Sequence, residues 1–161
     1  MRTELETIRE MYAYNSKVRQ KYLRAIWRLP PRERYRDRGA SYPSLVDIFM
    51  HVLDAYRWWF HVVYGKEKGI EEYPLGVRYT IAEARREEKE TDAFVRRVVR
   101  SLQPADLAKR VTIVRKRGNE TLPMRVLLLH MMEEELQHRG EMNALLWQLD
   151  IEPPVEGFDD R

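Results

Sequence analysis

The sequence predicts an all-α protein that folds as an antiparallel four-helix bundle, with a single domain over residues 1–161. Four long segments carry apolar residues at helical spacing, and Pro or Gly bounds them. No repeat, low-complexity tract or linker divides the chain. With 161 residues, 43% of them hydrophobic, the chain is long enough to bury its own core. Four helices of about 20 to 28 residues pack economically as a bundle, which is therefore the expected architecture.

The first three helices are predicted near residues 3–29, 44–64 and 80–102. Each begins with a capping box, in which a hydroxyl residue is followed three positions later by an acid, so that both side chains accept from free backbone N–H groups. The three boxes are Thr3/Glu6, Ser44/Asp47 and Thr80/Glu83. Breakers follow each helix, namely Pro30-Pro31, Gly65 with Gly69, and Pro104.

A fourth helix is predicted from about residue 122 to residue 149, with Thr121 as its N-cap and Pro123 tolerated in its first turn. The stretch before it, RVTIVRKRGNET, alternates apolar and charged residues around Gly118-Asn119. This alternation is typical of a short hairpin. It fits an extended loop equally well, so both remain open between the third and fourth helices.

Composition removes several classes of chemistry. The chain has no Cys, which excludes thiolate nucleophiles, Cys-ligated zinc, iron–sulfur clusters and disulfides. Its net charge is +3, and its Arg residues are interspersed with acids, so nucleic-acid binding is not expected. The N-terminus has no apolar signal core, and the longest apolar runs fall far short of the ~18 residues that span a bilayer. We therefore expect a soluble cytoplasmic protein that does not bind membranes.

Helical geometry places two of the four histidines toward the core. At about 100° per residue, His138 lies within roughly 20° of the middle of an apolar stripe on the last helix. On the same wheel, Glu134 lies at about −40°, Glu135 at about +60° and His130 at about −80°. Glu134 is therefore predicted to point inward best of these three. The same construction puts His51 on the apolar face of the second helix.

A carboxylate on a buried helix face needs a partner, because burying an unpaired charge costs several kcal/mol. A divalent metal ion bound by His51, Glu134 and His138 supplies that partner. Two imidazoles and one carboxylate leave coordination positions open for water or substrate, an arrangement that suits catalysis. A structural explanation also stands, in which Glu134 forms a salt bridge with an Arg of another helix and both histidines hydrogen-bond within the core.

Three stretches of the sequence match a family pattern. SLVDIFMHVLDAYRWW resembles the second-helix His motif of the DinB-like (YfiT-like) metal-binding four-helix proteins. LLLHMMEEELQHRGEMNALLWQLDIEPP resembles their fourth-helix signature, and MYAYNSKVRQKYLRAI is similar to their first helix. The likeness covers essentially the whole chain. It implies a four-helix bundle with a metal site, and it implies a homodimer because homodimers are common in the family.

The resemblance also assigns metal ligands. It places the family's second-helix His on His51 and the His that precedes Arg-Gly on His138. The remaining ligand, usually a His, falls on Glu134, and a carboxylate there shifts preference toward harder ions. The implied cofactor is a divalent ion, Zn, Ni, Mn or Fe. Known members include thiol S-transferases and a thiol-dependent isomerase, so the resemblance implies a small-molecule substrate and a low-molecular-weight thiol.

These observations favour a metal-dependent enzyme, either a thiol-dependent S-transferase or a hydrolase-like enzyme. The nucleophile would come from outside the chain, because no Cys and no serine-nucleophile motif is present. Asp54 and Asp47, one turn either side of His51, are candidates to orient its ring, although Asp47 is also the capping acid. His130 is a candidate hydrogen-bonding neighbour of the ligands. The alternative function is that of a metal-free bundle that acts as a stress-associated interaction protein.

Overall fold

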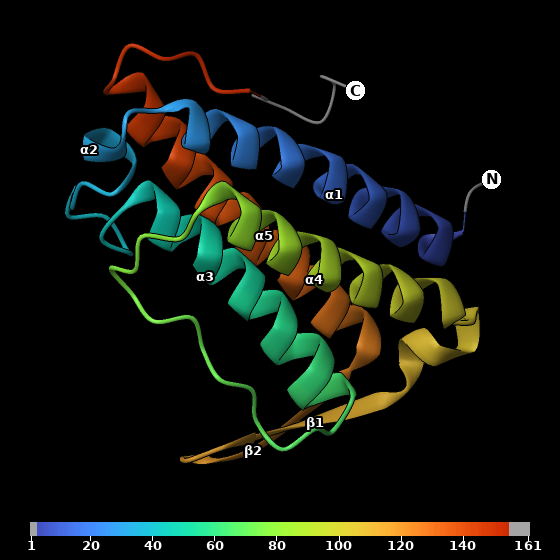
Figure 1. Cartoon of the computed structure of the whole chain (residues 1–161). Coiled ribbons are helices and arrows are strands. Elements are labelled where there is room, and N and C mark those ends of the chain that lie inside the picture. The colour runs from blue at the N-terminus through green and yellow to red at the C-terminus, as the bar shows by residue number, and fades with distance from the viewer. Residues whose placement is uncertain (1–2, 155–161) are drawn as a thin grey trace.

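The computed structural model describes residues 3–154 and confirms the predicted four-helix bundle (Figure 1). Each long helix lies within two residues of its predicted bounds. The bundle helices are α1 (Glu4–Arg28), α3 (Leu45–Arg57, continued by a π-helix over Trp58–Tyr64), α4 (Ile81–Ser101) and α5 (Met124–Trp147). Two short helices, α2 (Pro31–Arg34) and a 3₁₀ turn (Pro104–Ala108), lie between them. None of the described helices has the length and apolarity that a membrane span requires.

The three predicted capping boxes are all formed. In each, the hydroxyl accepts from the backbone of the third helical residue, and the acid of that residue accepts from the backbone of the cap. These reciprocal bonds satisfy N–H groups that have no partner inside the helix. The starts of α1, α3 and α4 are therefore determined locally by two residues each.

The predicted start of α5 is wrong in one respect, because Pro123 and not Thr121 occupies the N-cap position. Thr121 belongs to β2 (Gly118–Pro123), which pairs antiparallel with β1 (Arg110–Arg115). Its hydroxyl lies 3.2 Å from that of Thr112 across the hairpin. Of the two alternatives for this stretch, the hairpin is therefore the one that forms. Gly118 has a φ of +123°, a backbone conformation that favours glycine over other residues at the turn.

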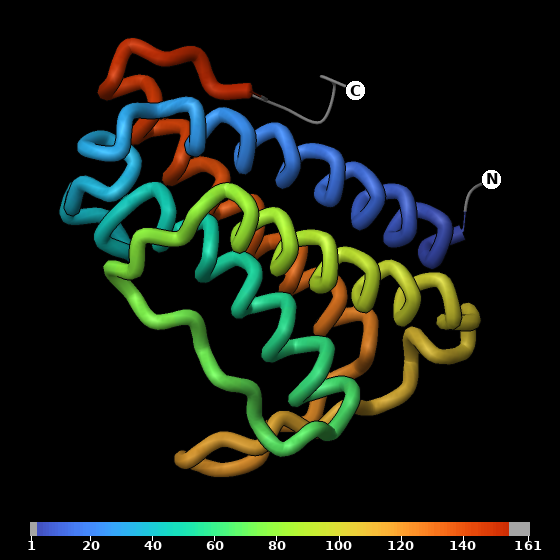
Figure 2. Tube along the Cα trace, viewed as in Figure 1, coloured from blue at the N-terminus to red at the C-terminus, as the bar shows by residue number. Residues whose placement is uncertain are grey.

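A long crossover joins α3 to α4. Residues 65–80 run back along the bundle, so that α3 and α4 start at the same end (Figures 1 and 2). Two carboxylates of α3 hold this segment by backbone N–H groups. Asp47 Oδ1 accepts from Gly76 N at 2.7 Å, and Asp54 Oδ2 accepts from Tyr73 N at 2.7 Å. The segment is therefore fastened along α3 at two points.

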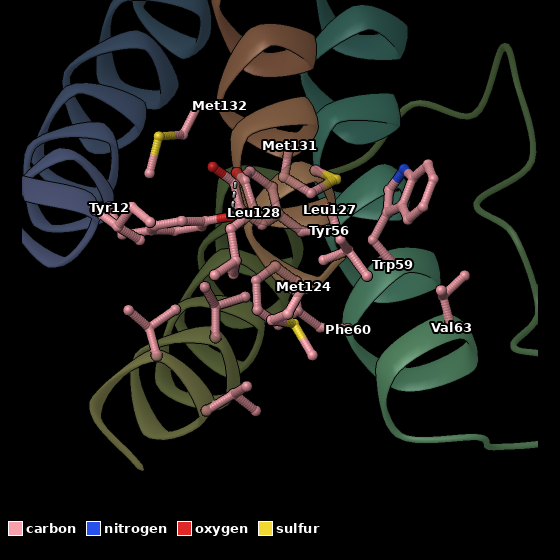
Figure 3. Close-up of a cluster of buried hydrophobic side chains, with 14 of the residues drawn as sticks. Tyr12, Tyr56, Trp59, Phe60, Val63, Met124, Leu127, Leu128, Met131 and Met132 are labelled. Carbon is pink, nitrogen blue, oxygen red and sulfur yellow. Dashed lines mark hydrogen bonds between the residues drawn. The ribbon is translucent and has the colours of Figure 1, made fainter. Parts of the chain in front are cut away.

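Two clusters of buried apolar side chains fill the bundle. One contains Leu5 and Ile8 near the start of α1, and the other contains Leu23 and Ile26 near its end. Figure 3 shows the first cluster, in which methionines and leucines of α5 meet aromatic rings of α1 and α3. Between the clusters, the bundle buries several polar side chains: Asn15, Ser16, Arg19, Glu88, Thr91, Glu135, Arg139 and Asn143.

Arg19 is the cation of this buried layer. Its Nη1 donates to Glu135 Oε2 at 2.7 Å, and it lies 3.7 Å from Glu88 and 3.6 Å from Asp92. The Tyr56 hydroxyl donates to the same Glu135 oxygen, and the Arg19 guanidinium lies over the Tyr56 ring. Burial, followed by the Glu135 charge, raises the pKa of Tyr56. The layer therefore joins α1, α3, α4 and α5 through one guanidinium.

The predicted orientation of the two neighbouring acids is wrong. The Glu135 side chain is only 4% exposed, whereas the Glu134 side chain is 24% exposed. The salt bridge to an Arg of another helix, considered for Glu134, is made by Glu135 with Arg19. The helical wheel treated all apolar residues of α5 as one stripe and could not include a buried guanidinium on α1 as a partner.

Substituting Arg19 with Met should destabilise the fold strongly. Glu135 and Glu88 would keep their burial and lose their cation, and breaking a buried ion pair from one side costs about 3–5 kcal/mol. The measurement is the free energy of unfolding from urea denaturation. Arg24→Met, at an exposed position on the same helix, should change that free energy by less than about 0.5 kcal/mol. Equal effects of the two substitutions would contradict the assigned role of Arg19.

Candidate metal centre

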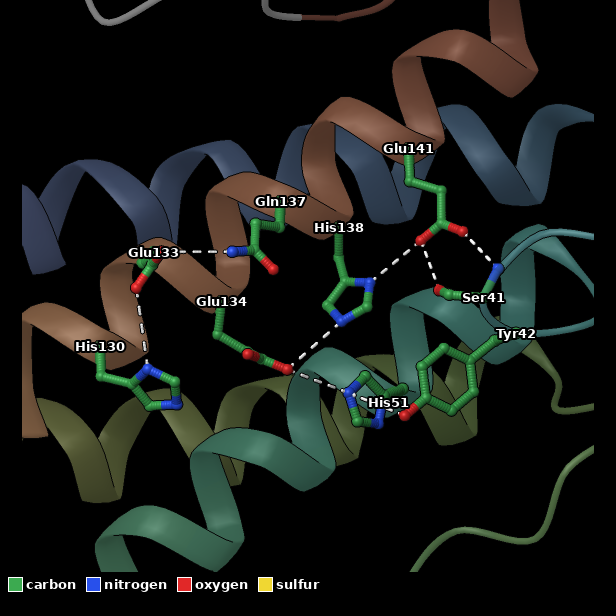
Figure 4. A network of polar contacts seen from close by, with 9 residues as sticks. All are labelled: Ser41, Tyr42, His51, His130, Glu133, Glu134, Gln137, His138 and Glu141. Atoms are coloured by element: carbon green, nitrogen blue, oxygen red, sulfur yellow. Dashed lines mark hydrogen bonds and ion pairs between the residues drawn. The ribbon is translucent and has the colours of Figure 1, made fainter.

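Three side chains from two helices converge beside the crossover (Figure 4). His51 comes from the middle of α3, and Glu134 and His138 come from one face of α5 at i, i+4 spacing. One potential ligand atom from each lies within 4.8 Å of the others. Glu134 Oε1 lies 3.4 Å from His51 Nε2 and 3.4 Å from His138 Nε2. The three sequence-predicted residues are therefore brought together.

The spacing of these atoms is compatible with a common metal ion. Donor atoms that lie about 2.0–2.1 Å from one tetrahedral ion are about 3.4 Å apart from each other. Both Glu134–His distances match this value, and both imidazoles approach through Nε2. Side-chain exposures of 21% for His51, 24% for Glu134 and 11% for His138 place the cluster at the edge of the core. An ion there would be held by protein and still be accessible to a small molecule.

His138 is oriented by a second carboxylate. Its Nδ1 lies 3.1 Å from Glu141 Oε2, one helical turn farther along α5. The other end of this contact is fixed as well, because the backbone N–H and hydroxyl of Ser41 both donate to Glu141 at 2.6 Å. Burial opposes ionisation of Glu141, but the hydrogen bonds from Ser41 and His138 outweigh it and hold its pKa below the usual range. An ionised Glu141 keeps a proton on His138 Nδ1, which leaves the Nε2 lone pair directed at the cluster.

Tyr42 covers His51. The two rings stack at a centroid distance of 3.9 Å, and the Tyr42 hydroxyl lies 3.1 Å from His51 Nε2. Burial, together with the nearby charge of His138, lowers the pKa of His51, although Glu134 opposes that change. A neutral imidazole is the form that binds a metal. The same Nε2 lone pair would otherwise accept from Tyr42, so the hydroxyl and an ion compete for it.

Of the other sequence-predicted residues, Asp47 has one of its expected roles, and Asp54 and His130 do not contact the cluster. Asp54 was a candidate to orient His51, but among the described residues it accepts from Tyr73 N and from Arg57 at 2.9 Å. Asp47 is the capping acid of α3, as its alternative assignment predicted, and it also holds the crossover. Over the described part of the chain, His130 lies 3.8 Å from Glu133 and packs its ring on Trp59, and neither contact is with the three clustered residues.

A cavity of about 480 Å³ opens onto the cluster, with His51 and Glu134 in its wall. Its volume is within the range of small-molecule sites. One wall is formed by α3 and the first turn of the π-helix, and the opposite wall by the crossover. The remaining lining residues are Tyr42, Asp47, Met50, Asp54, Ala55, Trp58, Trp59, Ile70, Glu72, Tyr73, Pro74, Leu75, Arg115 and His130.

Sequence reasoning missed Ser41, Tyr42 and Glu141. Glu141 carried a detectable signal, because it lies three residues after His138 and therefore on the same side of α5. Ser41 and Tyr42 lie in the loop before α3, and no periodicity reports where a loop side chain points. Only the folded structure places them against α5.

Comparison with known proteins then identifies the family. The model of the DinB family matches residues 1–158 of the sequence. The chain belongs to the DinB family. A solved structure described as a DinB-like protein from Bacillus cereus ATCC 10987 is similar to this DinB-family chain, with a TM-score of 0.69 and 20% identity, over 94% of this chain and 97% of that one. At this identity the similarity supports the fold alone. No curated protein matches the sequence.

In this DinB-family chain, Asp54 should make stability depend on pH. Burial raises its pKa to about 6, against the opposing hydrogen bond from Tyr73 and charge of Arg57. The folded state therefore binds the proton more tightly than the unfolded state, and this contribution to stability is lost as pH rises from about 4 to about 6. In wild type we expect the free energy of unfolding to fall by roughly 1–3 kcal/mol over this pH range, and Asp54→Asn should remove that fall.

Urea denaturation of both proteins at pH 4, 5, 6 and 7 measures this difference. Only the slope against pH matters, because Asn also differs from a carboxyl group in its hydrogen bonds with Tyr73 and Arg57, which changes the variant's stability at every pH. Asp37→Asn, at an exposed loop position, is the control and should follow the wild-type curve. Parallel curves for wild type and Asp54→Asn would show that Asp54 does not titrate in this range.

Proposed function

We propose that the protein is a divalent-metal-dependent enzyme that uses a nucleophile supplied from outside the chain. The observation that carries the proposal is the cluster of His51, Glu134 and His138, whose donor atoms lie within 4.8 Å of one another. Two of the three residues, His51 and Glu134, line the cavity. When bound, the ion would act as a Lewis acid and lower the pKa of a bound water or thiol. Membership of the DinB family is consistent with such a site.

The chain's own residues limit the reaction class. It has no Cys to attack a substrate, so the nucleophile of a transfer or hydrolysis is a small thiol or water. The cavity has room for a small molecule beside the cluster. A thiol-dependent transferase is therefore the finer form of the proposal, and a hydrolase-like reaction is the form in which water takes the place of the thiol.

The protein groups around the cluster would prepare it for an ion. Glu141 and Ser41 set the tautomer and direction of His138, and Tyr42 fixes the ring plane of His51. The Tyr42 hydroxyl has to release His51 Nε2 when an ion binds. With one carboxylate among the ligands, Mn²⁺ and Fe²⁺ are better matched than they would be by three imidazoles, while Zn²⁺ and Ni²⁺ also bind this donor set.

Metal binding is tested by removing one ligand at a time. After remetallation, wild type should hold close to one equivalent of ion, and Glu134→Ala and His138→Ala should lose most of it, as measured by elemental analysis and calorimetric titration. Glu134→His should retain metal and shift selectivity toward zinc or nickel, which imidazole suits. Glu133→Ala is the matched control, since Glu133 is exposed and adjacent to Glu134.

The metal-free function is favoured by one observation, the hydrogen bond between Tyr42 and the ring nitrogen of His51 that an ion would need. In that case the cluster is a hydrogen-bonded network and the bundle acts by binding a partner. Less than a tenth of an equivalent in wild type after trials with all four metals would reject the metal-dependent enzyme and leave this alternative.

Glu141 supplies an independent test of the proposed ligand set. Glu141→Gln keeps the size of the side chain and removes the charge that holds the proton on His138 Nδ1. Loss of such a contact typically lowers metal affinity about 10–100-fold. Competition with a chelator measures the affinity, and Gln137→Ala on the exposed side of α5 is the control. Unchanged affinity in Glu141→Gln would remove His138 from the ligand set.

A further inference from the structure

The wall of the cavity has an unbalanced charge. Four carboxylates line it, from Asp47, Asp54, Glu72 and Glu134, against the single guanidinium of Arg115. Arg115 lies at the end of β1, is about half-exposed and lies 3.8 Å from Glu120. Arg57 does not line the cavity but pairs with Asp54 at 2.9 Å, so the metal-free cavity has four carboxylates against two guanidiniums and is net negative. An anionic ligand would meet repulsion there, and a cationic one attraction.

The four carboxylates differ in whether they have a partner. Asp47 and Asp54 accept hydrogen bonds from the crossover, and Glu134 belongs to the cluster. Glu72 makes no hydrogen bond or ion pair with any other residue over the described part of the chain. Glu72 is exposed, and the hydrogen bond from Tyr73 N to Asp54 holds the backbone of the residue next to it. Glu72 is therefore a carboxylate available to a ligand.

Aromatic rings form much of the remaining wall. Trp58 and Trp59 lie edge to face with a centroid separation of 4.8 Å, and Tyr73 lies on the opposite wall. The Arg57 guanidinium already lies 4.4 Å from the centre of the Tyr73 ring, so that ring holds a cation within the protein itself. Aromatic faces attract ammonium groups, most strongly when a carboxylate is near. Carboxylate and indole together are the chemistry that recognises an amine.

We propose that this cavity takes a substrate that carries a protonated amine on an apolar or aromatic body, with Glu72 pairing with the amine and Trp58 packing on the body. The reacting end of the substrate would then lie toward His51 and Glu134. That orientation rests on the proposed function. Recognition of the amine does not, because Glu72 and Trp58 belong to the wall and not to the cluster.

Three probes of similar size test the charge preference in metal-free protein: 2-phenylethylamine, 2-phenylethanol and phenylacetate. Tryptophan fluorescence and calorimetry measure their binding. The amine should bind saturably, about tenfold tighter than the alcohol, and phenylacetate should bind most weakly. Higher salt should weaken binding of the amine and leave binding of the alcohol unchanged, since only the amine binds through an ionic interaction.

Variants locate the interaction. Glu72→Gln should weaken binding of the amine about tenfold and leave binding of the alcohol unchanged. Glu71→Gln, at the adjacent exposed position, should leave the binding of both probes unchanged. Phenylacetate binding as tightly as the amine, or equal amine binding by wild type and Glu72→Gln, would overturn the proposal. Repeating the titrations after trials with Zn²⁺, Ni²⁺, Mn²⁺ and Fe²⁺ separates the two proposals, because amine selectivity without uptake of any of these metals rejects only the metal-dependent function.

Discussion

The buried ion pair between Arg19 and Glu135 determines how α5 is rotated about its axis. A charge removed from water must meet its partner at hydrogen-bonding distance, and Glu135 pairs with Arg19, on α1, at 2.7 Å. With Glu135 directed at α1, the preceding residue is turned by about 100° and Glu134 faces α3. The pair at the centre of the bundle therefore sets the direction of the cluster at its edge. One run of acids serves both packing and the site.

The cavity depends in a similar way on α3. Asp47 and Asp54 lie one turn before and about one turn after His51, and both hold the crossover by backbone N–H groups. These bonds keep residues 65–80 against the helix, where they form the outer wall of the cavity. The same helix therefore contributes a ring to the cluster and fixes the segment that encloses the space in front of it. Asp47 and Asp54 therefore affect both the stability of the crossover and access to the cavity.

The sequence was informative where the signal is local. Capping boxes and apolar spacing located the four long helices, because both depend on residues three or four apart. Helix faces and the family pattern also selected His51, Glu134 and His138, which the structure brings together. The relative burial of Glu134 and Glu135 was not predictable, because it is decided by Arg19, 116 residues away. Loop residues such as Ser41 and Tyr42 follow no regular spacing from which their direction could be predicted. Asp54 was assigned to the His51 ring because its actual partner, Tyr73, lies in a segment without regular spacing.

His51 of the cluster is synthesised well before Glu134 and His138, because the two parts are far apart along the chain. His51 and Glu134 are 83 residues apart, and α5 is made after the other three bundle helices. At roughly 5–20 residues per second, the ribosome takes several seconds to pass from one to the other. Throughout that interval Arg19 and His51 both lack their α5 partners. A ligand that bridges α3 and α5 would therefore stabilise the bundle only after α5 has docked against α3.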